Sequence, residues 1–133
     1  MDSKKLSKRL ISLIFFILIV NFLALKFYWY SSIWYFDMIM HFLGGLWIGL
    51  AYIYVFKVKD RSLNSILRVI VSVLLVGIAW EFYEIAVNDV LAQNAFNYLD
   101  TISDLFFDLA GGGTAILYSF IKIITDTQDT KEL

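Results

Sequence analysis

The chain has 133 residues, of which 60% are hydrophobic, and a net charge of −1. Its mean hydropathy of +0.73 is far above that of a soluble domain. The lack of cysteine excludes disulfides and thiolate chemistry. The chain also has no basic tract interleaved with aromatic residues, the pattern that nucleic-acid-binding proteins carry. We therefore expect a single all-α membrane domain over residues 1–133, whose chemistry must come from helices and short loops.

The first apolar run long enough to cross a bilayer covers residues 10–30. Four basic residues precede it, as they would in a signal peptide. The run ends, however, in the aromatic stretch Phe27–Tyr30 and not at a small-residue cleavage site. Aromatic residues of this kind gather at membrane interfaces. We interpret the run as a retained transmembrane helix.

The second span is predicted at residues 37–56. Within it, Asp37, His41, Gly45 and Gly49 follow one another in steps of four, so they share one face of the helix. Three alternatives remain open on this face. The aspartate could cap the helix, the histidine could be a hydrogen-bonded packing residue, and the two glycines could form a dimer face.

The third span is predicted at residues 65–87. It carries Glu81 and Glu84 near its C-terminal end, where the helix dipole disfavours anions. Capping therefore does not explain these two acids. Ionisable side chains inside a span are costly and indicate a functional site.

The fourth span is predicted at residues 102–124, with Asp104 and Asp108 on one face. Asp104 could belong to a capping box that begins at Thr101, whereas Asp108 lies too deep in the helix to cap it. The polar residues 126–133 are expected to fray.

Basic residues predict the orientation of the four helices. Ten of the eleven Lys and Arg residues flank the N-terminus, the second loop or the C-terminus, and only Lys26 lies toward the other side. Because basic residues favour the cytoplasmic side, both termini are expected in the cytoplasm. Short loops predict an antiparallel bundle. The longest outer segment, 88–100, is expected to form an interfacial helix or a cap.

The ionisable residues of the last three spans form pairs at one predicted depth. The pairs are Asp37 and His41, Glu81 and Glu84, and Asp104 and Asp108. With the predicted topology, all lie within about two helical turns, roughly 10 Å, of the outer boundary. Gly45, Gly77 and Gly112 each lie one turn to the cytoplasmic side of a pair. The sequence thus predicts an acidic cup that opens outward above a floor of glycines.

Five carboxylates in such a cup cannot all stay ionised and unpaired. The nearby bases are His41 and, at a similar level, Lys26. An oxygen-rich site with one imidazole suits Mg²⁺, Mn²⁺ or Ca²⁺, and Zn²⁺ is also compatible. We predict Glu84 as a general base. The predicted metal ligands are Asp37, His41, Glu81, Asp104 and Asp108.

Three stretches of these helices carry a family resemblance: DMIMHFLG at 37–44, WEFYE at 80–84 and DTISDLFFDLAG at 100–111. Together they resemble the YjdF-type family of uncharacterised membrane proteins and, more distantly, the VanZ-like family associated with teicoplanin resistance. The VanZ pattern has Gln where Glu84 stands and Asn where Asp108 stands, so these departures favour the YjdF-type family. The resemblance covers roughly residues 36–120. It implies a small helical membrane protein without an established activity.

Three functions follow as hypotheses for a multi-pass protein of the cell membrane. In the first, the cup binds a cation and with it the head group of an envelope amphiphile, where a metal could activate water. The second is a proton- or cation-coupled transporter. The third is a non-catalytic envelope accessory or resistance protein. Whether the chain is an enzyme stays open, and a homo-oligomer is compatible with all three.

Overall fold

The computed structural model describes residues 2–87 and 96–131, and all regular structure in these residues is helical. The predicted all-α class is thus confirmed. The helices are α1 (Ser3–Lys26), α2 (Trp29–Ser32), α3 (Phe36–Val55), α4 (Leu63–Val87) and α5 (Tyr98–Asp129).

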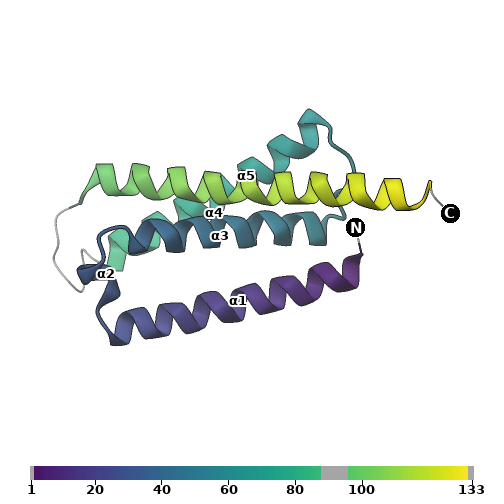
Figure 1. The fold of residues 1–133 in the computed structure, drawn as a ribbon. Helices are drawn as coiled ribbons and strands as arrows, with labels where there is room; N and C mark the ends of the chain where they lie inside the picture. The colour runs from purple at the N-terminus through teal and green to yellow at the C-terminus, as the bar shows by residue number, and fades with distance from the viewer. Residues whose placement is uncertain (1, 88–95, 132–133) are drawn as a thin grey trace.

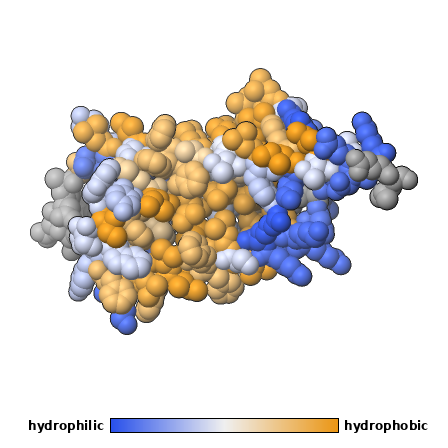
Figure 2. Space-filling model, in the orientation of Figure 1, coloured by the Kyte–Doolittle hydropathy of each residue, from blue (hydrophilic) through white to orange (hydrophobic). Residues whose placement is uncertain are grey.

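Four of these helices, α1, α3, α4 and α5, are long and apolar enough to cross a membrane. Large apolar side chains such as Phe22, Phe82 and Phe106 are exposed on them, as a bilayer requires. Figure 2 shows apolar atoms over the middle of the molecule and hydrophilic atoms gathered at one end. Both termini lie at that end (Figure 1). Its placement in the cytoplasm stays a prediction.

The first span begins and ends earlier than predicted. The side chain of Asp2 caps α1 by accepting a hydrogen bond from the backbone N–H of Lys4 at 2.9 Å. At the other end the helix stops at Lys26, because Tyr28 adopts a left-handed conformation with φ of 58°. The aromatic stretch Phe27–Tyr30 therefore forms a turn and the start of α2, and does not end the span as predicted.

The short helix α2 is held against the start of α3 by aromatic contacts. The rings of Trp29 and Tyr30 lie edge-on to the ring of Phe36, with centroid distances of 5.7 and 4.9 Å. Phe36 is buried by these contacts. The contacts place Tyr30 above the first turn of α3, close to the predicted cup.

Both capping alternatives for the acids of the cup are wrong. The N-cap of α3 is Tyr35, so Asp37 lies inside the first turn. The N-cap of α5 is Asn97, whose side chain accepts from the backbone N–H of Leu99 at 3.2 Å. This cap starts α5 four residues before the predicted boundary, so Asp104 lies in the second turn of the helix.

The other end of α5 also differs from the prediction. The helix continues to Asp129. The expectation that the chain frays from residue 126 is therefore wrong for residues 126–129. Of the outer segment predicted as an interfacial helix or a cap, residues 88–95 lie outside the described residues, and Tyr98–Asp100 are the first turn of α5.

Glycines bring α3 and α5 into the closest packing of the bundle. A Cβ atom on Gly45 would overlap the backbone of Asp108, and one on Gly111 would overlap the backbone of Phe42. Gly49 lies against Ala115 on α5, where an added Cβ would come within 2.7 Å of the alanine methyl. Because α5 of the same chain covers both Gly45 and Gly49, the dimer-face alternative is not supported.

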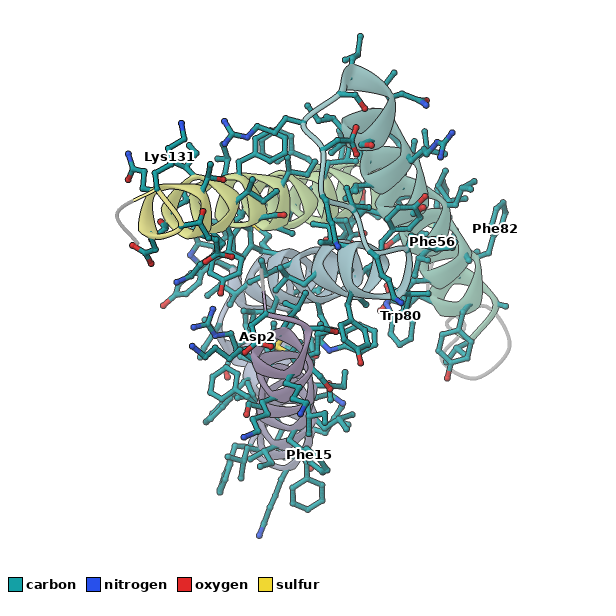
Figure 3. The ribbon with its side chains drawn as sticks, turned by 90° about the vertical axis from the view of Figure 1, so that its right-hand side faces the viewer. Asp2, Phe15, Phe56, Trp80, Phe82 and Lys131 are labelled. Atoms are coloured by element: carbon teal, nitrogen blue, oxygen red, sulfur yellow. The ribbon has the colours of Figure 1, made fainter. Side chains whose placement is uncertain are left out.

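Helix α1 is attached to the bundle mainly through α3. Among the described residues, no Cα atom of α1 lies within 8 Å of one in α4. Figure 3 shows α1 projecting from α3 on the side away from α5, with α4 set apart from it. The α3–α5 pair and α4 therefore frame the predicted cup, and α1 stands beside it.

Candidate cation-binding site

His41 lies at the centre of the predicted cup and contacts four of its acids. Its Nδ1 is hydrogen-bonded to Asp108 Oδ1 at 3.2 Å. Its Nε2 lies 3.7 Å from Asp104 Oδ2, 3.8 Å from Asp37 Oδ1 and 3.9 Å from Glu81 Oε1. The structure thus brings together residues of α3, α4 and α5, as the sequence predicts.

The two ring nitrogens of His41 have different environments. The contact with Asp108 fixes the direction of the ring, as a carboxylate commonly does for a histidine that binds a metal. The three oxygens around Nε2 are too distant for good hydrogen bonds. Two of the three, those of Glu81 and Asp104, belong with His41 to one group of ligand atoms that lie within 4.8 Å of one another. One ion can bridge that spread, since oxygen ligands of Ca²⁺ lie about 2.3–2.6 Å from it.

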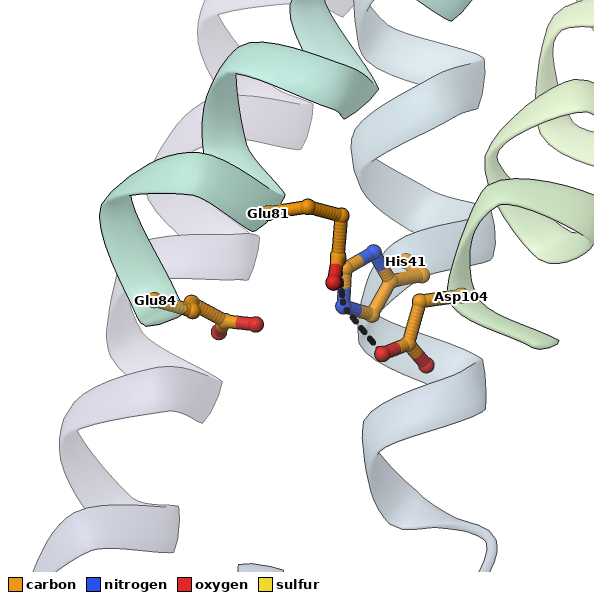
Figure 4. Close-up of side chains that lie close together, drawn as sticks. All are labelled: His41, Glu81, Glu84 and Asp104. Carbon is orange, nitrogen blue, oxygen red and sulfur yellow. Dashed lines mark ion pairs between the residues drawn. The ribbon is translucent and has the colours of Figure 1, made fainter. Parts of the chain in front are cut away.

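One set of four side chains offers ligand atoms that all lie within 4.8 Å of one another. The set consists of His41, Glu81, Glu84 and Asp104 (Figure 4). Glu84, which the sequence analysis assigns as a general base, therefore lies within ligand distance. It is also the one member of the set that is only partly buried. A cation held here would be approached from the Glu84 side.

A second set contains a residue that the sequence analysis did not assign to the site. Asp37, Asp100 and Asp104 also offer oxygens within 4.8 Å of one another. Asp100 is exposed in the first turn of α5 and lies four residues before Asp104, so the two share a helical face. That spacing was the available signal. The sequence analysis does not assign Asp100 to the site, because it predicts that this helix begins after Asp100.

Four polar residues of the cup are almost fully buried. The exposed fractions are 7% for His41, 5% for Glu81, 2% for Asp104 and 4% for Asp108. Among the residues that the structure describes, Glu81 Oε1 and Asp108 Oδ2 have no hydrogen-bond partner. An ionised oxygen buried without a partner is strongly disfavoured, so protons or a cation must compensate this group.

The predicted second base does not join this group. Lys26 ends α1, and its Nζ lies over the ring of Phe27, 5.8 Å from the ring centroid. In the part of the chain that the structure describes, the ion pairs of the cup all involve His41.

A cavity of about 290 Å³, here called the side pocket, opens beside the cup between α1, α3 and α4. Its polar lining residues are Asn21, Tyr30, Asp37, His41, Glu84 and Asp108. The Tyr30 hydroxyl donates to Asn21 Oδ1 at 2.7 Å and so joins α2 to α1. Burial, followed by the charges of Asp37 and Glu84, raises the pKa of Tyr30 to about 12. Its hydroxyl therefore remains a neutral donor at physiological pH.

Changing Tyr30 to phenylalanine is expected to loosen the outer end of α1. Loss of one hydrogen bond should lower the free energy of unfolding by about 0.5–1.5 kcal/mol, because Asn21 loses its partner. Thermal unfolding in detergent would measure this change. Tyr35→Phe is the matched control, because Tyr35 is half-exposed at the start of α3. An equal loss in both variants would contradict the assigned role of the Tyr30 hydroxyl.

Comparison with known proteins gives one match. The model of a family described as "Predicted membrane protein (DUF2238)" matches residues 2–123, nearly the whole chain. This family is the YjdF-type family, so that resemblance is confirmed. No curated protein and no solved structure matches. The more distant resemblance to the VanZ-like family stays a prediction.

Proposed function

We propose that this chain, which belongs to the DUF2238 family of predicted membrane proteins, binds a cation in its acidic cup. The favoured cation is a divalent metal such as Mg²⁺, Mn²⁺, Ca²⁺ or Zn²⁺. We further propose that the cup handles the head group of an envelope amphiphile at the outer side of the cell membrane. In this proposal the membrane helices supply both the site and access to lipid.

The arrangement around His41 Nε2 carries the proposal. Three carboxylate oxygens from three helices lie 3.7–3.9 Å from this nitrogen without hydrogen-bonding to it. One of them, Glu81 Oε1, is buried and has no hydrogen-bond partner within residues 2–87 and 96–131. Such a group has a lower free energy when a cation lies among its oxygens, because the ion replaces the lost hydration of the carboxylates.

The residues divide into ligands and a positioning residue. His41, Glu81, Glu84 and Asp104 are the proposed ligands, because their ligand atoms meet within 4.8 Å. Asp108, predicted from the sequence as a ligand, is better placed to orient His41 through Nδ1. A bound metal would polarise a water molecule. In a hydrolytic version of the proposal, Glu84 would serve as the general base and not as a ligand, since it is the least buried of the four.

Binding of Mn²⁺ to the purified protein in detergent tests the proposal. We expect saturable binding of Mn²⁺, measured from the electron paramagnetic resonance signal of the free ion. At 100 times the dissociation constant, the ion should stabilise the fold by about 2.7 kcal/mol. The absence of saturable binding to the wild-type protein would overturn the proposal that the cup binds a divalent metal.

Asp60 provides a control for nonspecific attraction to a carboxylate. Hydrogen bonds from Ser62 and Ser65 lower the pKa of Asp60 to about 2, so it is ionised at neutral pH, and it is fully exposed. It lies on the connection between α3 and α4, away from the cup. The Asp60→Asn variant should bind Mn²⁺ as the wild-type protein does.

Packing below the cup gives the transport alternative no support. Val69, Val73, Ala115 and Ile116 are buried together on the inner side of the cup. A Cβ atom on Gly112 would come within 2.9 Å of Val73, so α4 and α5 are in close contact there. In the described helices the ionisable groups of the cup thus end above a packed apolar core. A path for ions through one chain would have to disrupt that core.

A further inference from the structure

We infer that the side pocket binds a membrane amphiphile with a cationic amine head group, which enters from the bilayer between α1 and α4. The amine would lie against the acids at the inner end of the pocket, and the first part of the alkyl chain would lie along its apolar wall. This inference rests on the proposed attraction of the cup for cations and adds the class of the ligand.

The pocket has the form that such a ligand requires. Its apolar wall comes from three helices and consists of Ile17, Leu18, Ile48, Val76 and Trp80. Among the described residues, α1 and α4 have no Cα atoms within 8 Å of each other, so the parts of the wall on these two helices are set apart. Figure 3 shows this separation on the side of α3 where Trp80 lies. In this inference the alkyl chain enters between these two helices.

The polar end of the pocket selects for positive charge. Asp37, Glu84 and Asp108 line it, and no Lys or Arg of the described residues does. Asp108 is only 4% exposed, and its Oδ2 has no hydrogen-bond partner in the described part of the chain. An ammonium group has three donors and a positive charge, which matches unpartnered carboxylate oxygens. The rings of Tyr30 and Trp80 add faces that attract cations.

The count of acids disfavours an anionic head group. Six carboxyl groups lie in the cup and its rim: Asp37, Glu81, Glu84, Asp100, Asp104 and Asp108. One divalent cation would neutralise only two of them if all were ionised. A phosphate would add negative charge to whatever part of this excess protons and the cation leave uncompensated, at a low dielectric constant where repulsion is strong. An amine reduces that excess.

A substitution at Gly44 can fill the side pocket without displacing a helix. Gly44 lines the pocket, and a Cβ atom built on it meets nothing within 4 Å. A phenylalanine at this position would therefore occupy the space proposed for the amphiphile. Gly113 is the matched control, because it is also a helical glycine with open space beyond its Cβ position, and it does not line the pocket.

The experiment compares three probes of equal chain length, namely dodecylamine, dodecanol and dodecyl phosphate. Their binding to the wild-type, Gly44→Phe and Gly113→Phe proteins is measured by isothermal titration calorimetry in dodecyl maltoside micelles. We expect dodecylamine to bind the wild-type protein at least about tenfold more tightly than either other probe. Gly44→Phe should lose that preference, and Gly113→Phe should keep it.

Equal or tighter binding of dodecyl phosphate, or unchanged dodecylamine binding by Gly44→Phe, would overturn the inference. If Gly44→Phe does not fold, Ile17→Trp tests the same pocket from α1. Mn²⁺ binding is measured on the same samples. Retained Mn²⁺ binding without amine binding refutes this inference alone, whereas retained amine binding without Mn²⁺ binding refutes only the metal part of the proposed function.

Discussion

Replacing Asp104 with asparagine is expected to lower the affinity for Mn²⁺ by at least about 100-fold, more than a typical loss of a residue that only orients a ligand. Asp104 belongs to both sets of side chains that could hold a cation, and it is 2% exposed. Its Oδ2 is also the acidic oxygen closest to His41 Nε2, at 3.7 Å. An amide oxygen in its place has no net charge to offer the ion.

The same variant should be more stable than the wild-type protein when no cation is present. Asp104 lies among like charges from Asp37, Glu81 and Asp100, and removal of one charge relieves their repulsion. As Mn²⁺ is added, the wild-type protein should become more stable than the variant. Thermal unfolding with chelator and with saturating Mn²⁺ measures both effects. A purely structural role for Asp104 would instead lower stability in both conditions.

Asp108→Asn separates ligands from the positioning residue. Because asparagine retains an oxygen that can accept from His41 Nδ1, this variant should lose affinity for Mn²⁺ by only about 10–100-fold. If Asp108→Asn lost more affinity for Mn²⁺ than Asp104→Asn does, Asp108 would be a ligand, as the sequence analysis predicts.

Replacing Gly45 with valine is expected to have the largest effect on folding. A Cβ atom at this position overlaps the backbone of Asp108, which cannot rotate away as a side chain would. Overpacking of a well-packed core usually costs about 1–3 kcal/mol. Here α3 and α5 would have to separate, so we expect a loss at or above the upper end of that range.

Gly44→Val is the matched control for this prediction. It makes the same change one residue away, where a Cβ atom meets nothing within 4 Å. Size-exclusion chromatography and thermal unfolding in detergent should show a stable Gly44→Val protein and a destabilised or aggregated Gly45→Val protein. Similar behaviour of the two variants would mean that α3 and α5 are not packed as closely as described.

Helical periodicity was sufficient to predict that the polar side chains of α3, α4 and α5 lie near one another. The pairs on α3, α4 and α5 share faces because they are three or four residues apart, and the structure brings all six side chains together. The glycines of α3 were likewise expected to pack, and α5 covers them. These features depend on spacing within one helix, which a sequence displays directly.

Features that depend on local backbone conformation or on relations between helices were not predicted. The sequence analysis predicts the end of the first span too late along the chain, because nothing in the aromatic stretch indicates that Tyr28 takes a left-handed conformation. Asp100 was missed because the cap at Asn97 was not recognised. The side pocket depends on the distance of α1 from α4, which no spacing within one helix encodes.

Asp108 contributes its backbone to the contact with Gly45 and its carboxylate to His41. The separation of α3 and α5 and the direction of Nε2 are therefore linked through one residue. If the proposed cation binds, turning this histidine to fit an ion of larger radius would break its contact with Asp108. The adjustment would then fall to Glu84, the partly buried member of the set on α4. Discrimination between small and large ions would thus reside in how freely α4 moves against a fixed α3–α5 pair.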